Sequence, residues 1–384
     1  MAKGFSTRLI HAGEGGARSL TTPIYETTTF TFESAAELQR YQAGGGGFLY
    51  SRYENPTVVA LEEKLAAADG AEDALAFGSG MAATATLLMA LTSPGDEVVC
   101  AAAIYGGTLH ILTDLLARFG VTARFVKVED LANLSTVFGP HTKMLWFETP
   151  SNPTLRCVDI ATVATACKKA GVTSVIDNTF ASPMNQRPLA RGVDLSMQSA
   201  SKYLNGHSDV TAGVVSGPAA MLERIAKTRR LLGGILDPQP AYALMRGLKT
   251  LPVRMAQHNA NALAVAQGLE GHPALVRVWY PGLPSHPDHA IAKAQMTGFG
   301  GMVCLDLKGG QDAAIRAYDR LTLVKRAASL GGVESLVSLP VLTSHYGHTD
   351  AQLAEGGVTR GMLRVSVGLE DAADVLADLR QAVE

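Results

Sequence analysis

The stretch LSMQSASKYLNGHSDVTAGVV, residues 195–215, decides how this chain is organised. It places one lysine, Lys202, beside the small hydroxyl residues Ser199 and Ser201, at the end of an apolar run and just before a glycine-containing turn at 205–206. A lysine held in a desolvated position loses its proton readily and suits Schiff-base chemistry. A lone Ser-x-Lys is more often a surface lysine after a strand, so the rest of the chain must decide between these interpretations.

Short apolar runs alternate with helical patterns before this stretch. We expect strands at 74–77, 97–101, 122–128, 144–147, 174–176 and 194–197, and helices at 58–68, 82–91, 109–119 and 160–170. Repeated units of this length predict an α/β fold with a large, mostly parallel sheet flanked by helices. Ligands of such sheets bind at the carboxyl ends of the strands, where Gly80, Glu148, Asp177 and Lys202 fall.

One of these strand ends has the residues of an anion site. Gly78-Ser79-Gly80-Met81 lies between an expected strand and an alanine-rich helix. The glycines let backbone N–H groups approach a ligand, and the helix N-terminus carries partial positive charge. The turn matches neither a dinucleotide fingerprint nor a P-loop, and an ordinary strand-to-helix turn is the alternative.

Composition limits the class of protein. The chain has 384 residues, with 47% hydrophobic and 18% charged residues and a net charge of -2. This size favours two domains, and the absence of a basic stripe argues against nucleic acid or an anionic membrane as partners. The four cysteines are scattered, which argues against a disulfide framework or a zinc site. With no apolar run near about 18 residues and no signal-peptide core, we expect a cytoplasmic protein.

The pattern divides the chain into three regions. Residues 1–55 have weak periodicity and cannot build a core, so we expect an extended segment that contacts a neighbouring subunit. Residues 56–238 hold the alternating units. Residues 239–384 begin with a long helical stretch at 239–269 and continue as a smaller α+β domain. Its expected strands are 302–307 and 363–367, and its expected helices are 312–321 and 372–383.

The candidate side chains together suit one cofactor. Lys202 could form an imine, the 78–81 turn could bind a phosphate, and Asp177 could keep a pyridine nitrogen protonated. Arg364 stands inside an apolar strand, either facing solvent or forming a fork for a carboxylate. Tyr105 follows another strand and could stack on an aromatic ring. This set matches pyridoxal 5'-phosphate with an amino-acid substrate.

The motifs that carry these residues resemble a known family. The chain is similar nearly end to end to the Cys/Met metabolism PLP-dependent enzymes, the trans-sulfuration enzymes of the fold type I PLP-dependent transferases. The motifs are Tyr50-Ser-Arg-x-x-Asn-Pro-Thr57, Gly78-Ser-Gly-Met81, Tyr105-Gly-Gly-Thr108, Glu148-Thr-Pro-Ser-Asn-Pro153, Val175-Ile-Asp-Asn-Thr179, Ser199-Ala-Ser-Lys-Tyr203, Ser329-Leu-Gly-Gly332 and Arg364-Val-Ser-Val-Gly368.

The resemblance implies a role for each site residue. Lys202 would bind the cofactor covalently, Asp177 would pair with its pyridine nitrogen, and Tyr105 would stack on the ring and transfer protons. The phosphate would be bound by Ser199, Ser201, Gly80 and Met81, and by Tyr50 and Arg52 from another subunit. The substrate α-carboxylate would be bound by Asn152, Ser329 and Arg364. The resemblance also implies a homotetramer built from dimers that share active sites, and no metal.

The resemblance further implies a reaction. We expect γ-elimination on cystathionine, methionine or homocysteine, as in cystathionine γ-lyase and methionine γ-lyase, with γ-replacement by a transferase as the alternative. A third hypothesis is a vitamin-binding protein without catalysis. Ala328 and His110 stand where the cystathionine enzymes carry charges for the distal amino acid, Gly107 replaces the cysteine of methionine γ-lyase, and Glu54 matches no familiar member. We interpret His345 and His348 as loop residues rather than a metal pair.

Overall fold

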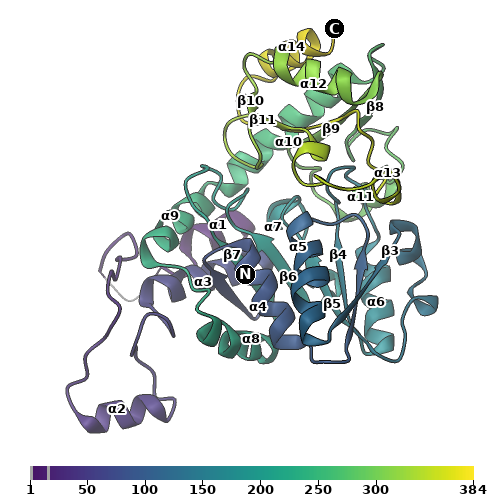
Figure 1. Ribbon diagram of the computed structural model, residues 1–384. Coiled ribbons are helices and arrows are strands. Elements are labelled where there is room, and N and C mark those ends of the chain that lie inside the picture. Colours follow the sequence, from purple (N-terminus) through teal and green to yellow (C-terminus); the bar gives the residue numbers. More distant parts are fainter. Residues whose placement is uncertain (1–2, 15–17) are drawn as a thin grey trace.

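Two sheets, one above the other in Figure 1, organise the protein. The computed structural model describes residues 3–14 and 18–384. The larger sheet has seven strands in the order β1-β7-β6-β5-β4-β2-β3, and the smaller has five in the order β10-β11-β12-β9-β8. The α/β fold class is therefore confirmed.

The larger sheet is parallel except at one strand. Its strands are β1 (Asp73–Phe77), β2 (Glu97–Ala101), β3 (Thr122–Val126), β4 (Thr142–Glu148), β5 (Thr173–Asp177), β6 (Leu195–Ser199) and β7 (Gly213–Gly217). Strand β7 pairs antiparallel with both β1 and β6. Register partners Glu148 and Asp177 bring the ends of β4 and β5 side by side. The carboxyl ends of the central strands therefore meet at the edge facing the smaller sheet.

Helices cover both faces of the larger sheet because side chains alternate along its strands. Leu75 and Phe77 pack in one apolar core with side chains of α4 (Gly80–Leu91), α6 (Ile160–Ala170) and α8 (Ala219–Leu232). Ala74 and Ala76 pack in a second core with α3 (Pro56–Asp69) and α9 (Pro238–Lys249). This region also contains the short helices α5 (Gly106–His110) and α7 (Ser182–Asn185).

Local capping residues set where the helices of this region begin. Helix α3 starts at Pro56, and the side chain of Asn55 accepts a hydrogen bond from the Thr57 N–H at 2.9 Å. Its C-terminus follows the usual rule, because Gly70 adopts a left-handed φ of 71°. Ser79 caps α4 in the same way, accepting from the Ala82 N–H at 2.9 Å. The cap of α4 thus lies inside the predicted anion turn.

The smaller sheet has its own core. Its strands are β8 (Leu275–Trp279), β9 (Met302–Leu307), β10 (Lys325–Arg326), β11 (Leu336–Ser338) and β12 (Met362–Ser366). The accompanying helices are α10 (Leu251–Leu269), α11 (His289–Gln295), α12 (Gly310–Arg320), α13 (Asp350–Glu355) and α14 (Ala372–Val383). Apolar side chains of α10, α12 and α14 pack on this sheet. Most of its strand pairs are antiparallel, so the sequence prediction for this region is confirmed.

Two sequence-based expectations were wrong in detail. The helix expected at 239–269 is two helices that break at Thr250, because Pro252 has no N–H to donate inside a continuous helix. The helix expected at 109–119 begins at Gly106 and changes after His110 into a π-helical turn and then a 3-10 turn. Strands β7, β8, β10 and β11 and helices α7, α8, α11 and α13 were not predicted.

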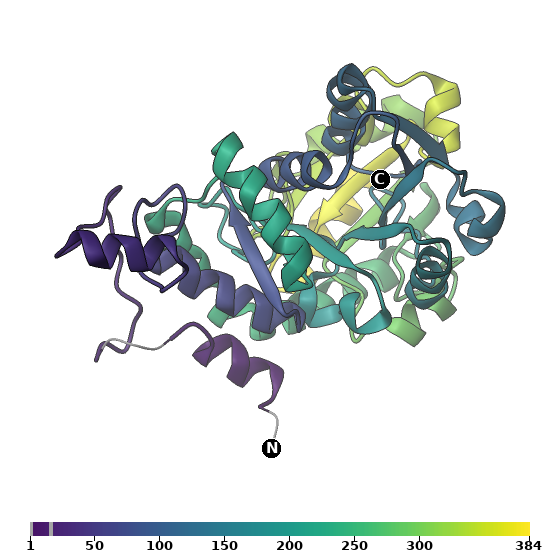
Figure 2. The ribbon, with the colours of Figure 1, turned by 90° about the horizontal axis from the view of Figure 1, so that it is seen from below.

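The N-terminal region carries two helices that we did not expect. Helix α1 (Phe5–His11) packs on α3 and α9, whereas α2 (Ala35–Gln42) stands away from the body in both views (Figures 1 and 2). Ser34 caps α2 by accepting from the Glu37 N–H, and Glu37 accepts from the N–H of Glu33. The Ser-x-x-Glu pattern was the sequence signal for this helix. We name residues 18–53 the arm.

Candidate active site

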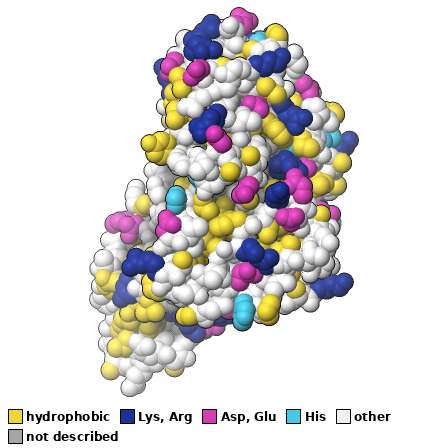
Figure 3. Space-filling view, turned by 45° about the vertical axis from the view of Figure 1, so that its right-hand side comes forward, with side chains coloured by type: hydrophobic (Ala, Val, Ile, Leu, Met, Phe, Trp, Pro, Cys, Tyr) yellow, Lys and Arg dark blue, Asp and Glu magenta, His cyan; other side chains and the backbone are white. Residues whose placement is uncertain are grey.

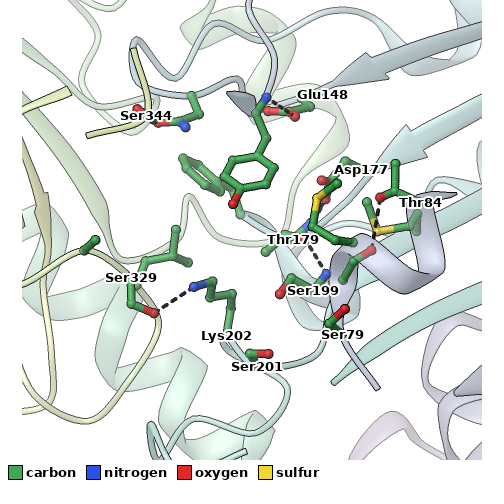
Figure 4. Close-up of a pocket in the computed structure, with 18 of the residues that line it drawn as sticks. Ser79, Thr84, Glu148, Asp177, Thr179, Ser199, Ser201, Lys202, Ser329 and Ser344 are labelled. Carbon is green, nitrogen blue, oxygen red and sulfur yellow. Dashed lines mark hydrogen bonds between the residues drawn. The ribbon is translucent and has the colours of Figure 1, made fainter. Parts of the chain in front are cut away.

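A cavity of about 710 Å³ lies between the carboxyl edge of the larger sheet and the smaller sheet. Figure 4 shows its polar side chains pointing toward one another from strand ends of the larger sheet and loops of the smaller one. The lining includes most of the predicted site residues: Gly80, Met81, Tyr105, Asn152, Asp177, Ser199, Ser201, Lys202, Ser329 and Arg364. These ten residues, which are spread between positions 80 and 364 of the sequence, therefore line the same cavity.

Lys202 follows strand β6 and reaches across the cavity. Its Nζ donates a hydrogen bond to Ser329 Oγ at 2.7 Å, drawn as a dashed line in Figure 4. Burial, reinforced by the positive charge of Arg364, lowers the pKa of Lys202 below its ordinary value. The lowered pKa favours the free amine, which is the nucleophilic form.

The turn before α4 is packed too tightly for side chains. A Cβ on Gly80 would lie 3.0 Å from Ser199 Cβ, and one on Gly213 would lie 2.3 Å from the carbonyl oxygen of Ser79. The missing Cβ atoms let the N-terminus of α4 approach β6 and β7, so that Ser199 borders the turn. A helix N-terminus with adjacent hydroxyls suits a bound phosphate.

Ser201 makes a less simple contribution. Its hydroxyl accepts from the Ala212 N–H at 2.9 Å and lies 3.2 Å from the Ala212 carbonyl oxygen, to which it donates. A serine has one hydroxyl proton, so Ser201 can donate a hydrogen bond to a phosphate only if it no longer donates to the Ala212 carbonyl oxygen. Its role in holding the loop before β7 could not be predicted from the sequence.

Asp177, which is half-buried, and Glu148, which is buried, form an acidic pair at the ends of β5 and β4. Asp177 Oδ1 accepts from the N–H of Thr179 at 3.0 Å and from its hydroxyl at 2.5 Å, while Thr179 Oγ1 accepts from the Ser199 N–H at 2.8 Å. Burial raises the pKa of Asp177 to about 6, against these hydrogen bonds. Burial and then Asp177 raise the pKa of Glu148 well above its ordinary value, although it accepts from the Tyr105 N–H at 2.7 Å.

This acidic pair needs a positive partner to ionise. Across the described ranges 3–14 and 18–384, no hydrogen bond reaches Asp177 Oδ2. Asp177 lines the cavity, so this oxygen can accept a hydrogen bond from a ligand. The chemistry of the site therefore suits a cation beside Asp177.

Arg364 is buried on strand β12 and is not the solvent-facing residue of the alternative interpretation. Its Nη1 donates to Asn152 Oδ1 at 3.0 Å and its Nη2 donates to the Ser329 carbonyl oxygen at 3.3 Å. Ser329 has a φ of 135°, a backbone conformation that side chains rarely adopt. Arg364, Asn152 and Ser329, far apart in the sequence, are thus connected beside the cavity.

Tyr50 and Arg52 are not among the cavity-lining residues of this chain. Arg52 Nη1 donates to the Arg230 carbonyl oxygen at 2.6 Å, and its guanidinium lies 4.8 Å from the centre of the Tyr53 ring. Exposed apolar side chains mark the same region, including Leu20 at 94% exposure and Leu231 at 85%. Figure 3 shows hydrophobic side chains gathered on this lower-left part of the molecule.

Sequence reasoning missed several lining residues. It placed Ser79 in the anion turn, Glu148 at a ligand-binding strand end and Ala328 beside the distal part of the substrate, but gave no site role to Thr84, Pro150, Thr179, Phe180, Met197, Thr211, Leu330, Thr343 and Ser344. Glu148 had a signal, because it ends a strand beside the Asp177 strand. Thr179 had one too, since a threonine two residues after an aspartate can donate to its side chain. Thr211, Thr343 and Ser344 had none.

Membrane-spanning helices and metal-binding clusters are both absent from the part of the chain that the structure describes. Among residues 3–14 and 18–384, no helix is long and apolar enough to cross a membrane. Within the same ranges, no cluster of three or more His, Cys, Asp or Glu side chains is arranged to hold a metal ion. The rings of His345 and His348 lie edge to face, with centres 5.1 Å apart, and His345 Nδ1 lies 2.9 Å from Ser344 Oγ.

The chain is similar in sequence to enzymes of sulfur amino-acid metabolism with different reactions. It is 43% identical to L-methionine gamma-lyase of Pseudomonas deceptionensis, over 99% of this chain and 97% of that protein. It is 42% identical to cystathionine beta-lyase of Coxiella burnetii, over 98% and 97%. It is 40% identical to chloroplastic cystathionine gamma-synthase 1 of Arabidopsis thaliana, over 98% of this chain and 68% of that protein.

A solved structure and a family model agree with these relatives. The crystal structure of metB from Corynebacterium glutamicum superimposes with a TM-score of 0.92 at 39% identity, covering 99% of this chain and 98% of that one. The family model described as Cys/Met metabolism PLP-dependent enzyme matches residues 6–384. The chain therefore belongs to the Cys/Met metabolism PLP-dependent enzymes of the fold type I PLP-dependent transferases, and its cofactor is pyridoxal 5'-phosphate.

Proposed function

We propose that this enzyme is a C–S lyase that performs γ-elimination on a sulfur-containing L-amino acid. The substrate would be cystathionine, methionine or homocysteine, and the products 2-oxobutanoate, ammonia and a thiol. The observation that carries the proposal is the half-buried amine of Lys202, in one cavity with Asp177, Tyr105 and Arg364. Relatives with 39–43% identity are named L-methionine gamma-lyase, cystathionine gamma-synthase and cystathionine beta-lyase, and each of these names contains a sulfur amino acid.

The residues present fit pyridoxal 5'-phosphate. The free oxygen of Asp177, whose raised pKa calls for a positive partner, suits a protonated pyridine nitrogen. The glycine-packed turn at the start of α4, with Ser199 beside it, suits the phosphate. Tyr105 borders the space between and can stack on the ring. We assign cofactor binding to Gly80, Met81, Tyr105, Asp177, Ser199, Ser201 and Lys202, and from another subunit to Tyr50 and Arg52.

The bound cofactor supplies an electron sink for negative charge that develops at the substrate Cα. Arg364 would hold the α-carboxylate with both guanidinium nitrogens, and Asn152 and Ser329 keep that guanidinium in place. With the carboxylate fixed, the Cα–H bond points to one place in the cavity. This orientation lowers the entropic part of the barrier.

Lys202 and Tyr105 would move the protons. Lys202 Nζ, as a free amine, would remove the Cα proton, as its lowered pKa favours, and could take a Cβ proton only after it has passed the first proton on. The Tyr105 hydroxyl, or the protonated Lys202, would donate to the γ-sulfur as the C–S bond breaks. Ser329 Oγ, 2.7 Å from Nζ, would keep the amine on the correct side of the substrate.

The distal part of the cavity favours an uncharged substrate tail. The charged residues in the lining are Glu148, Asp177, Lys202 and Arg364. Glu148 already accepts from the Tyr105 N–H, and we assign the other three to the cofactor or the carboxylate. The remaining side chains near the smaller sheet include Ala328, Thr343 and Ser344, which carry no charge. A thioether such as methionine therefore fits this wall better than the second amino acid of cystathionine, whose charges would lack partners within this chain.

A substrate panel tests the proposal. The purified enzyme is incubated with methionine, homocysteine, cystathionine, and O-succinylhomoserine plus cysteine, with Lys202→Ala as the matched control. We expect 2-oxobutanoate and thiol from a sulfur amino acid, and none with the control. Net cystathionine synthesis that exceeds cleavage would favour γ-replacement, pyruvate would favour β-elimination, and no product from any substrate would support a vitamin-binding protein.

The relatives also keep γ-replacement as a second candidate, because one of them is named cystathionine gamma-synthase. The assembly that we propose is the homotetramer of dimers implied by the resemblance. Its support here is the arm, which places Tyr50 and Arg52 outside this chain's own cavity and exposes apolar side chains such as Leu20. Sedimentation or light scattering of the holoenzyme measures that assembly.

A further inference from the structure

Glu54 is joined to Arg52 through helix α8. Arg52 Nη1 donates to the Arg230 carbonyl oxygen at 2.6 Å, and Arg230 Nη2 donates to Glu54 Oε1 at 2.7 Å. The chain therefore closes a loop on itself, from Arg52 to the backbone of Arg230 and through its side chain back to Glu54. This loop attaches the Tyr-Ser-Arg segment to the body of the subunit.

The contact on α8 is well suited to hold a guanidinium. Arg230 lies in the last turn of α8, where carbonyl groups lack helical partners and carry partial negative charge. In the described part of the chain no backbone N–H donates to the Arg230 carbonyl oxygen from beyond the helix. On its other side the Arg52 guanidinium lies 4.8 Å from the Tyr53 ring and 5.8 Å from the Tyr50 ring.

We propose that Glu54 and Arg230 are positioning residues, which hold Arg52 ready for the cofactor phosphate in the site of a neighbouring subunit. The inference rests on the proposed function, in which Arg52 serves such a shared site. Glu54 is an acidic residue two positions from that arginine, and a free carboxylate there would compete with the phosphate for the guanidinium. Its pairing with Arg230 removes this competition and fixes the backbone between them.

A plain surface ion pair is the rival explanation. The side chains of Arg230 and Glu54 are 39% and 42% exposed, and such pairs contribute little to stability. A pair of that kind would leave cofactor binding unchanged. A bare negative charge near the phosphate would instead weaken binding, so that its removal would tighten it. A positioning role gives the opposite sign, because removal of Glu54 releases Arg52.

The experiment measures the dissociation constant of pyridoxal 5'-phosphate. The holoenzyme is dialysed against buffers with decreasing cofactor concentration, and the bound cofactor is measured by its visible absorbance. Glu54→Gln and Arg230→Met should each weaken binding about twofold to fivefold, the effect of one partly exposed charged contact. Neither should change the binding of pyridoxal, which has no phosphate. The matched control is Glu223→Gln, because Glu223 pairs with Lys227 at 2.9 Å on the same helix and should leave cofactor binding as it is.

Arg52→Met distinguishes the proposal of a shared site from the proposal that Glu54 and Arg230 position Arg52. If Glu54 acts through Arg52, then Glu54→Gln should cause no further loss when added to Arg52→Met. Loss in Arg52→Met without loss in Glu54→Gln or Arg230→Met would overturn this proposal and leave the shared site standing. No loss in Arg52→Met would overturn both. The positioning role would also be overturned if Glu54→Gln bound pyridoxal 5'-phosphate more tightly, or if its affinity for pyridoxal fell as much as its affinity for pyridoxal 5'-phosphate.

Discussion

Replacement of Arg364 by lysine tests the assignment of the carboxylate site. Arg364 is buried, and its Nη1 and Nη2 donate to Asn152 Oδ1 and to the Ser329 carbonyl oxygen at 3.0 and 3.3 Å. A guanidinium so fixed can offer a carboxylate two parallel hydrogen bonds, whereas an ammonium is a single flexible point charge. Arg364→Lys therefore keeps the charge and removes the fork.

The expected cost follows from this geometry. Loss of one charge-assisted hydrogen bond in a buried site costs about 1.5–3 kcal/mol, which corresponds to roughly 10-fold to 150-fold in kcat/KM. The assay compares the best amino-acid substrate of the panel with the amine that lacks its carboxylate. We expect the loss for the amino acid and little change for the amine, with the melting temperature recorded for both proteins. An equal loss for both compounds, or no loss for the amino acid, would refute the assignment.

Two further predictions depend on pH. Asp177, whose pKa burial raises to about 6 in the cofactor-free protein, should pair with the pyridine nitrogen only when ionised, so cofactor affinity should fall as pH drops through about 6. Asp177→Asn should bind the cofactor more weakly at pH 8, and its cofactor affinity should not fall further as the pH drops through about 6. If the affinity of this variant still falls, the pH dependence belongs to another group. Asp378 accepts four hydrogen bonds from Thr322, Leu323 and Val324. Burial alone would raise the pKa of Asp378, but these hydrogen bonds lower it to about 2. Ionised Asp378 therefore stabilises the folded state fully above the unfolded pKa of about 3.9, and this stabilisation is lost as the pH falls from there toward about 2. Asp378→Asn should reduce the free energy of unfolding by about 1–3 kcal/mol at pH 7 and by less as pH falls through 4, as urea titrations can measure, whereas a constant difference would contradict the account.

Much of the architecture could be predicted because apolar patterns mark buried strands. The expected strands at 97–101 and 302–307 match β2 and β9 residue for residue, and the others differ by a few residues at their ends. Strand β7 escaped prediction because Gly213 and Gly217 frame only three other residues, and glycine is rare inside strands. Its place beside β6 comes from tertiary pairing, which no local pattern contains.

The site could be predicted in part for a related reason. Parallel strands end at one edge of a sheet, so Asp177 and Lys202 had to lie near each other once the strands were placed. Arg364 had a local signal, a charge inside an apolar strand, whereas Ser329 was expected at the site only from the resemblance to the family. Their neighbours could not be foreseen at all, because contacts such as Ser201 with Ala212 depend on how two loops pack.

The arm was the least predictable region. Its weak periodicity gave no indication of the contact of Arg52 with Arg230, 178 residues further along the chain. A contact at that separation depends on the placement of α8 against the arm. Sequence spacing alone does not contain it.

Reduction of the holoenzyme with borohydride, followed by digestion and mass spectrometry, tests the central claim most directly. Borohydride converts a carbon–nitrogen double bond between lysine and cofactor into a stable bond, so the modified lysine can be identified. We predict that the peptide containing Lys202 carries the added mass of the reduced cofactor and that Lys202→Ala carries none. An unmodified Lys202 peptide, with the cofactor on a different lysine of the chain, would contradict the account.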